Sequence, residues 1–248
     1  MIKYDITFNK HKQLLKAPFK ILCIVSLICL SALQVHSQVI IALLFGDKLN
    51  SDRLEFGLSG GLNISNISNF ADTKTRTGFN LGLYFNIKLN DNCFLRVEAV
   101  PKFPTGVAKM KPYSLNDTGL DSLLYDGEVT REIRNIGLPV LIRYRIKNLL
   151  FAEGGPQLNL RTKAKDIFES GDLTYKNHIE DNITRFDFGF TFGLAQKLNK
   201  QIGAVALGIR YYIGLTDIDK LNPGSQKNGV FQILANIPIG VGKKKGTK

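Results

Sequence analysis

Residues 78–94 read GFNLGLYFNIKLNDNCF, and this stretch decides the fold class. Its apolar side chains fall on every second position from Phe79 to Leu89, and polar or small residues lie between them. Since successive side chains of a β-strand point to opposite faces, the stretch predicts a strand with one apolar face and one polar face. The fold then depends on which medium each face meets: a protein core, water or lipid.

The same period of two recurs along the chain, and the complete set comprises eight strands. No segment after residue 37 shows the period of a helix, so we expect an all-β protein. A chain of 248 residues is long enough for one large β domain. The strands are expected within residues 54–64, 79–89, 95–103, 136–146, 150–160, 186–194, 204–213 and 231–240.

The connections between these strands alternate strictly between short and long. Turns of two or three residues are expected at 90–92, 147–149 and 199–200, and long polar connections at 66–77, 104–130, 162–184 and 216–228. One end of the sheet therefore carries only tight turns, as in outer-membrane barrels with periplasmic turns and extracellular loops. A β-sandwich would distribute its long loops over both ends.

The two faces of the strands differ in charge. The apolar face carries only Glu132 and Arg134, both at the loop end of their strand. An eight-stranded barrel has room for one layer of interior side chains, far too little for all the large apolar ones. The apolar face must therefore point outward to lipid, where a charge near the midplane costs roughly 2–4 kcal/mol. The polar face holds Glu55, Lys88, Arg96, Glu98, Arg143, Arg145, Glu153, Asp187 and Arg210.

These observations predict an eight-stranded antiparallel up-and-down transmembrane β-barrel with short periplasmic turns and long extracellular loops. The sheet must close on itself, because an open edge in hydrocarbon leaves backbone groups without hydrogen bonds. The predicted location is the bacterial outer membrane.

The charges on the polar face are the candidate site, a structural ion network that plugs the interior. Its expected members are Glu55, Arg96, Glu98, Arg143, Glu153, Asp187 and Arg210. Three-residue turns would place Arg143 opposite Glu153, Asn86 opposite Arg96 and Tyr84 opposite Glu98. A two-residue turn at 199–200 would place Gly189 opposite Arg210 and Tyr212 opposite Asp187, so that Asp187 lies diagonal to Arg210.

The N-terminus carries a basic region, Lys10 to Lys20, followed by the largely apolar run of 13 residues Ile21–Leu33. That run is too short to span a bilayer comfortably and has the length of a signal-peptide core. Val35-His36-Ser37 is an acceptable small-residue cleavage site, so we expect residues 1–37 to be removed as a signal peptide. An uncleaved anchor that continues to Phe45 is the alternative.

The remaining chain divides into a periplasmic N-terminal segment, 38–52, the barrel, 53–241, and a basic C-terminal tail, 242–248. Cleavage lowers the formal net charge from +12 by four, to +8. The lysine-rich tail could touch anionic lipid or nucleic acid, but a solvated end is the simpler interpretation, and no nucleic-acid partner is expected. Cys93 is the one cysteine left after cleavage, so no internal disulfide is expected.

Several segments also resemble PorT-family outer-membrane β-barrel proteins. They are GLSGGLNISNIS (57–68), RTGFNLGLYFNIKLNDNCFLRVEAV (76–100), IRNIGLPVLIRYRI (133–146) and LFAEGGPQLNL (150–160). The resemblance implies an outer-membrane barrel but not a shared activity, since the name-giving member serves a type IX secretion pathway while most of the family has no assigned role. The chain departs from many such barrels in lacking Trp and in ending on GKKKGTK rather than on an aromatic residue.

Three functional classes follow. The favoured one is a non-enzymatic structural or interaction barrel without cofactor or metal, in contact with outer-membrane lipid and lipopolysaccharide, with secretion-apparatus or cell-surface proteins as candidate partners. The second is a hydrolase at the extracellular rim that would use His178 with a nucleophile such as Ser170. The third is a soluble lipocalin-like carrier. The acids Asp117, Asp121, Asp126 and Glu128 could hold a divalent ion, although their spacing matches no calcium loop and a solvated loop is the simpler interpretation.

Overall fold

The computed structural model describes residues 6–8, 53–201, 203–221 and 224–239. The predicted cleavage site, the segment 38–52 and the tail 242–248 lie outside these residues. Strand β1 (Ile6–Phe8) falls within the predicted signal peptide and pairs with β7 (Leu173–His178). Cleavage after Ser37 would therefore remove β1 from the mature protein.

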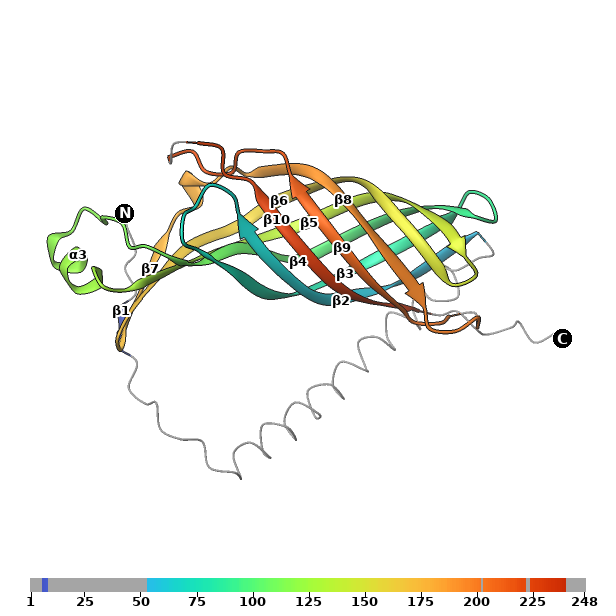
Figure 1. Ribbon diagram of the computed structural model, residues 1–248, viewed down its shortest axis with the longest axis horizontal. Coiled ribbons are helices and arrows are strands. Elements are labelled where there is room, and N and C mark those ends of the chain that lie inside the picture. Colours follow the sequence, from blue (N-terminus) through green and yellow to red (C-terminus); the bar gives the residue numbers. More distant parts are fainter. Residues whose placement is uncertain (1–5, 9–52, 202, 222–223, 240–248) are drawn as a thin grey trace, which may run out of the picture.

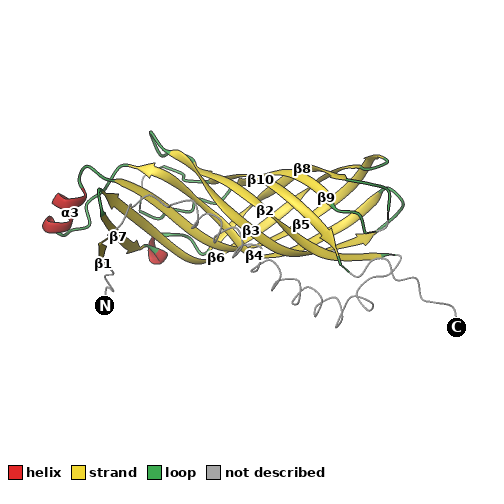
Figure 2. Ribbon diagram, turned by 90° about the horizontal axis from the view of Figure 1, so that it is seen from below, coloured by secondary structure: helices red, strands yellow, loops and turns green. Residues whose placement is uncertain are grey.

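Eight antiparallel strands close into a ring, as predicted (Figure 1). Closure occurs where β10 pairs with β2 and where β6 pairs with β8. Figure 2 shows the strands running obliquely along the wall, as closure of a sheet requires. In ring order the strands are β2 (Leu54–Ile67), β3 (Lys74–Lys88), β4 (Cys93–Met110), β5 (Glu128–Lys147), β6 (Leu150–Ser170), β8 (Phe186–Lys197), β9 (Ala206–Gly214) and β10 (Asn228–Pro238).

The apolar face of the strands points outward. Phe190 is 48% exposed and Leu207 is 51% exposed, whereas Arg96 is fully buried. In the opening stretch, Phe79 and Leu81 are exposed, and their polar neighbours face inward. Only lipid accepts such an outer surface, so the alternative of a soluble lipocalin-like carrier is wrong. No helix among the described residues has the length and apolarity needed to cross a bilayer.

The long connections were predicted as loops, but much of them is strand. β4 continues to Met110, and β6 continues to Ser170 and turns back as β7. The reason is a β-bulge: Arg134 pairs with Lys163 and Asn135 with Arg161, which leaves Thr162 as an extra residue. An extra residue reverses the alternation of the sequence, so a search for a period of two ends there although the strand continues.

The prediction that no helix follows the signal peptide was also wrong. Helix α3 (Thr118–Leu124) lies between β4 and β5, and a short 3-10 helix spans Glu180–Asn182. The side chain of Asp117 accepts hydrogen bonds from the backbone N–H groups of Gly119 and Leu120, which caps α3. Seven residues are too few for a recognisable helical period. The helix lies at the end of the barrel that carries β7, away from the short turns (Figure 1).

One hairpin differs in register from the prediction. Gly193, not Gly189, lies opposite Arg210, because six residues and not two separate the last hydrogen-bonded pair, Leu198 and Val205. Asn-Lys lacks the glycine that favours a two-residue hairpin turn, and Asn199 instead accepts a hydrogen bond from the N–H of Gln201. The shift is four residues, an even number, so every side chain keeps its predicted face.

Candidate functional site

The predicted interior charges form a cluster near the periplasmic turns. Arg210 Nη2 lies 2.7 Å from Glu98 Oε1, and Arg210 Nε lies 2.5 Å from Glu153 Oε1. Arg96 donates to Glu98 and, through Nη2, to Asn236 Oδ1 at 2.6 Å. Strand β9, which carries Arg210, is not adjacent in the ring to β4 or β6, so these ion pairs cross the lumen.

Arg143 borders the cluster with a weaker contact. Its Nε lies 3.8 Å from Glu153 Oε2, and its guanidinium stacks on the ring of Phe151 at 4.4 Å. The predicted cross-strand pairs Arg143–Glu153, Asn86–Arg96 and Tyr84–Glu98 are confirmed by the register. The structure thus brings five of the seven predicted site residues together: Arg96, Glu98, Arg143, Glu153 and Arg210.

Asp187 lies apart from that cluster, whereas Glu55 lies at its edge, linked to Arg96 through Asn86. Glu55 accepts a hydrogen bond from Asn86 and pairs with Lys197 at 3.4 Å. Asp187 accepts from Asn228 at 2.9 Å and from Asn159 at 3.3 Å, in a layer of buried amides. The predicted proximity of Asp187 to Arg210 was wrong, because the four-residue register shift places Arg210 nearer the periplasmic end.

An apolar cluster lies at the outer end of the barrel, above the amide layer. No local pattern of the sequence reveals this cluster, because it depends on the strand extensions and on loops that pack over them. Its buried members are Ile67, Val107, Met110, Leu124, Val129, Ile133, Ala164, Phe168, Tyr175, Ile179, Ile183 and Ile218. Among the described residues the interior is thus stratified into charges, amides and an apolar cap.

A second buried ion cluster joins this apolar cap to the wall. Arg131 on β5 binds Asp166 on β6 through Nε at 2.9 Å and Nη2 at 2.8 Å, and it binds Asp219 in the β9–β10 connection at 2.5 Å. Although burial disfavours its charge, hydrogen bonds to both carboxylates hold the pKa of Arg131 above its ordinary value. Burial and the neighbouring Asp166 raise the pKa of Tyr113, which donates to that carboxylate. These ion pairs hold the β9–β10 connection against the outer end of the barrel.

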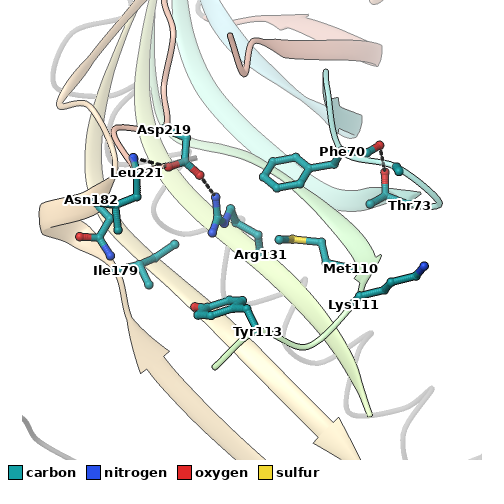
Figure 3. A pocket seen from close by; sticks show the side chains of 11 residues that line it. Phe70, Thr73, Met110, Lys111, Tyr113, Arg131, Ile179, Asn182, Asp219 and Leu221 are labelled. Atoms are coloured by element: carbon teal, nitrogen blue, oxygen red, sulfur yellow. Dashed lines mark hydrogen bonds and ion pairs between the residues drawn. The ribbon is translucent and has the colours of Figure 1, made fainter. Parts of the chain in front are cut away.

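A hollow of about 300 Å³ opens beside this cluster. In Figure 3, Arg131 and Asp219 point toward one another in its middle, with Phe70 and Met110 on one side and Ile179 on the other. The guanidinium of Arg131 lies 5.4 Å from the ring centre of Phe70. Mostly apolar side chains around a satisfied ion cluster can take up an apolar group. We call this hollow the outer pocket.

The residues considered for catalysis do not come together. His178 ends β7 and pairs with Lys165, whereas Ser170 lies at the other end of the same hairpin, opposite Leu173. Five residues of strand separate Lys165 from Ser170, which is about 16 Å. The imidazole of His178 instead lies 3.5 Å from Glu180. His178 and Ser170 therefore do not form a nucleophile–base pair.

Three of the four loop acids considered as metal ligands, Asp117, Asp121 and Glu128, have separate structural partners. Asp117 caps α3, and Glu128 pairs with Lys109 at 2.6 Å. Asp121 accepts from Ser114 and from the N–H of Leu115, and these hydrogen bonds hold the pKa of its carboxyl below the ordinary value.

A comparison with known families now adds to the geometry. The family described as outer membrane protein beta-barrel domain matches residues 45–220. The chain belongs to that family. The matched residues cover most of the closed ring. The chain is therefore a beta-barrel protein of the bacterial outer membrane.

Similar solved structures are also small outer-membrane proteins. Ail, the attachment invasion locus protein of Yersinia pestis, in complex with the heparin analogue sucrose octasulfate, has 11% identity and a TM-score of 0.43, over 75% of this chain and 99% of its own. Neisserial surface protein A has 12% identity and a TM-score of 0.41, over 73% and 96%. OprG from Pseudomonas aeruginosa has 17% identity and a TM-score of 0.35, over 74% and 93%. No curated protein sequence matches the chain.

Proposed function

We propose that this beta-barrel protein is a plugged, non-enzymatic interaction protein that binds a partner protein at its extracellular end. The observation that carries the proposal is the filled interior. Ion pairs cross the lumen near the periplasmic turns, and an apolar cap closes the other end. A barrel whose interior is occupied in this way acts through its surface rather than by passing solutes.

The outer pocket is the part of that surface best suited to a partner. Its volume of about 300 Å³ is at the lower limit for small-molecule pockets and suits one or two apolar side chains of a protein. Asp219 and Leu221 line it from the β9–β10 connection, so a partner seated there would contact both the wall and a loop.

The plugged state is tested by electrical recording. Purified protein reconstituted in planar lipid bilayers should produce no conductance steps, because the ion pairs of Arg210 block the lumen. Reproducible steps in the wild-type protein would contradict the proposal.

The binding end is tested by photo-crosslinking in intact cells. A photoreactive amino acid at Thr73 or Leu221, beside the outer pocket, should give a defined crosslinked protein. The matched control is the same amino acid at Lys200, which is exposed in a turn at the opposite end. Crosslinks from position 200 alone would mean that the partner binds at the periplasmic end, and this result would overturn the proposal.

A narrower form of the proposal makes the partner a component of a secretion apparatus. The resemblance of residues 57–68, 76–100, 133–146 and 150–160 to PorT-family proteins supports it. Cells that lack this protein should then secrete less type IX cargo, and cargo should accumulate in the periplasm. Unchanged secretion would remove the accessory role and leave the interaction proposal in place.

A further inference from the structure

The outer wall of β5, β6 and β7 carries a second hollow, distinct from the outer pocket. Its volume is about 180 Å³, and only charged residues and one histidine line it. We call it the basic hollow. It is lined by Glu132, Arg134, Lys163, Lys165, Lys176, His178 and Glu180.

Strand register brings the cations of the basic hollow together on one face. Arg134 lies directly opposite Lys163, and Glu132 lies opposite Lys165. Lys176 pairs with Ile167 on the next strand. The bulge at Thr162 matters here, because it puts Lys163 and Lys165 on the outer face while Ala164 stays inside.

The charges of the basic hollow do not balance. Glu132 is already held by Arg76 at 2.7 Å and by Lys165 at 3.1 Å. Glu180 lies 3.5 Å from His178 and accepts a hydrogen bond from the N–H of Ala164. In the part of the chain that the structure describes, Arg134, Lys163 and Lys176 form no ion pair with a carboxylate. Like charges opposite one another on paired strands destabilise a sheet, so a bound anion would stabilise this face.

The basic hollow lies at the upper edge of the lipid-facing band. On the outer face of β5, apolar residues and Tyr144 continue from Arg134 toward the short turns. The ten strand positions from Arg134 to Tyr144 cover about 33 Å, or about 25 Å across the membrane at a tilt near 40°, which is the height of the apolar band of such barrels. The same edge carries two cations that stack on outward aromatic rings, Lys102 on Phe79 and Arg185 on Phe186.

We propose that the basic hollow binds a phosphate group of an outer-leaflet glycolipid. Arg134, Lys163 and Lys176 would supply N–H donors to the phosphate oxygens, and the acyl chains would lie against the apolar wall of β5 and β6 below. Charge-assisted hydrogen bonds to phosphate are among the stronger ones in proteins. This inference depends on the outer-membrane location and not on the proposed partner at the outer pocket.

The test measures binding of phosphorylated lipid A to the detergent-solubilised protein by native mass spectrometry. Wild-type protein should retain the lipid. The variant R134Q/K163Q/K176Q, which leaves the Arg76–Glu132–Lys165 contacts intact, should bind it about tenfold more weakly or worse. The matched control K74Q/K111Q/K227Q removes three exposed lysines at the same end of the barrel and should bind as the wild type does.

Three results would overturn the inference. Equal loss in the control variant would mean a general electrostatic attraction. Equal binding of lipid A after enzymatic removal of its phosphates would mean that the acyl chains alone are recognised. Full displacement of the lipid by an equal concentration of inorganic phosphate would mean that the hollow binds free anions. Gel mobility without boiling, which reports barrel folding, must be unchanged in both variants.

Discussion

At the residue scale, the buried arginines determine how the interior side chains are arranged. Arg210 contacts Glu98 and Glu153 on two other strands, so one side chain joins three parts of the wall. A buried ion pair adds modest net stability, but removing one partner leaves the other charge uncompensated. The arginines therefore fix the arrangement of the interior more than they increase its stability.

Replacing Arg210 by methionine should lower the free energy of unfolding by about 3–5 kcal/mol, because two buried glutamates lose their principal partner. Urea titration in lipid vesicles, with the folded fraction read from gel mobility, measures this change. The control is Lys88→Met, which removes the exposed pair with Asp91 and should leave the titration unchanged. Equal stability of the Arg210 variant and the wild type would contradict the ion network.

Glu132 predicts a pH dependence at the outer wall. Burial raises the pKa of its carboxyl, but hydrogen bonds and attraction from Arg76 and Lys165 outweigh burial and hold the pKa below the ordinary 4.5. A lowered folded-state pKa gives stability that is present above the unfolded value and lost as the pH falls through the folded value. The wild type should therefore lose stability as the pH falls below the ordinary 4.5, and Glu132→Gln should lose less over that range. Hydrogen exchange of β5 and β6 at each pH would show the difference, and parallel profiles for the two proteins would refute it.

The sequence predicted cross-strand residue pairs correctly wherever the turn length was clear. Arg143 and Glu153 were found opposite one another because the chain reverses at 147–149 with little freedom. Asp187 was misplaced relative to Arg210 because the 199–204 segment forms its own hydrogen-bonded turn, and no local period reveals that. Parity was preserved, so the inward-facing set was right although one of its pairings was not.

At the element scale, irregular positions determine how far each strand extends. Gly106 on β4 has a φ of +140°, and a Cβ there would lie 2.0 Å from the carbonyl oxygen of Arg131. β4 and β5 change register nearby, between Val107 and Met110. Only glycine allows the two strands to approach at this point and to continue beyond the membrane.

Gly106→Ala should destabilise the protein by about 1–3 kcal/mol, through backbone strain and a clash with the neighbouring strand. Gly154→Ala is the matched control, since its Cβ would meet its nearest neighbour at an ordinary 3.6 Å. Thermal melting of both variants in the same detergent makes the comparison. If Gly154→Ala proved the more destabilising of the two, the account of Gly106 would fail.

The elements missed from sequence share one physical cause. A period of two identifies a strand only while no bulge interrupts it, and β4, β5 and β6 all pass through register shifts. The apolar cap was missed for the same reason: Phe168 faces inward because the bulge at Thr162 reverses the alternation of β6. Helix α3 was too short to be recognised by its period.

At the scale of the whole molecule, the small interior volume of an eight-stranded barrel determines which face of the strands meets lipid. Eight strands cannot enclose the large apolar side chains of this chain, and the structure places them outside. The alternation of short and long connections correctly predicted that the short turns share one end of the barrel. Neither observation could locate the outer pocket, which joins residues far apart in the sequence, or the basic hollow, which depends on the bulge at Thr162.

Phe190→Lys should cost roughly 2–4 kcal/mol, because it places a charge in the middle of the lipid-facing band. Leu198→Lys, at an equally exposed apolar residue beyond the end of β8, should cost only about 0–1 kcal/mol. Both values follow from urea titration in vesicles. Similar costs at the two positions would mean that β8 does not cross the hydrocarbon.

The extension of β5 and β6 above the membrane edge has one further consequence. Beyond Lys163, β6 stays paired with β5 for six residues, to Glu169, which is about 20 Å of strand, and it then turns back into β7 at Gly171, with open space around that glycine. This part of the barrel thus projects beyond the membrane as a hydrogen-bonded sheet rather than as an irregular loop. A peptide inserted into that turn would be held at a fixed height and orientation, so the barrel would be a suitable scaffold for displaying foreign epitopes on living bacteria.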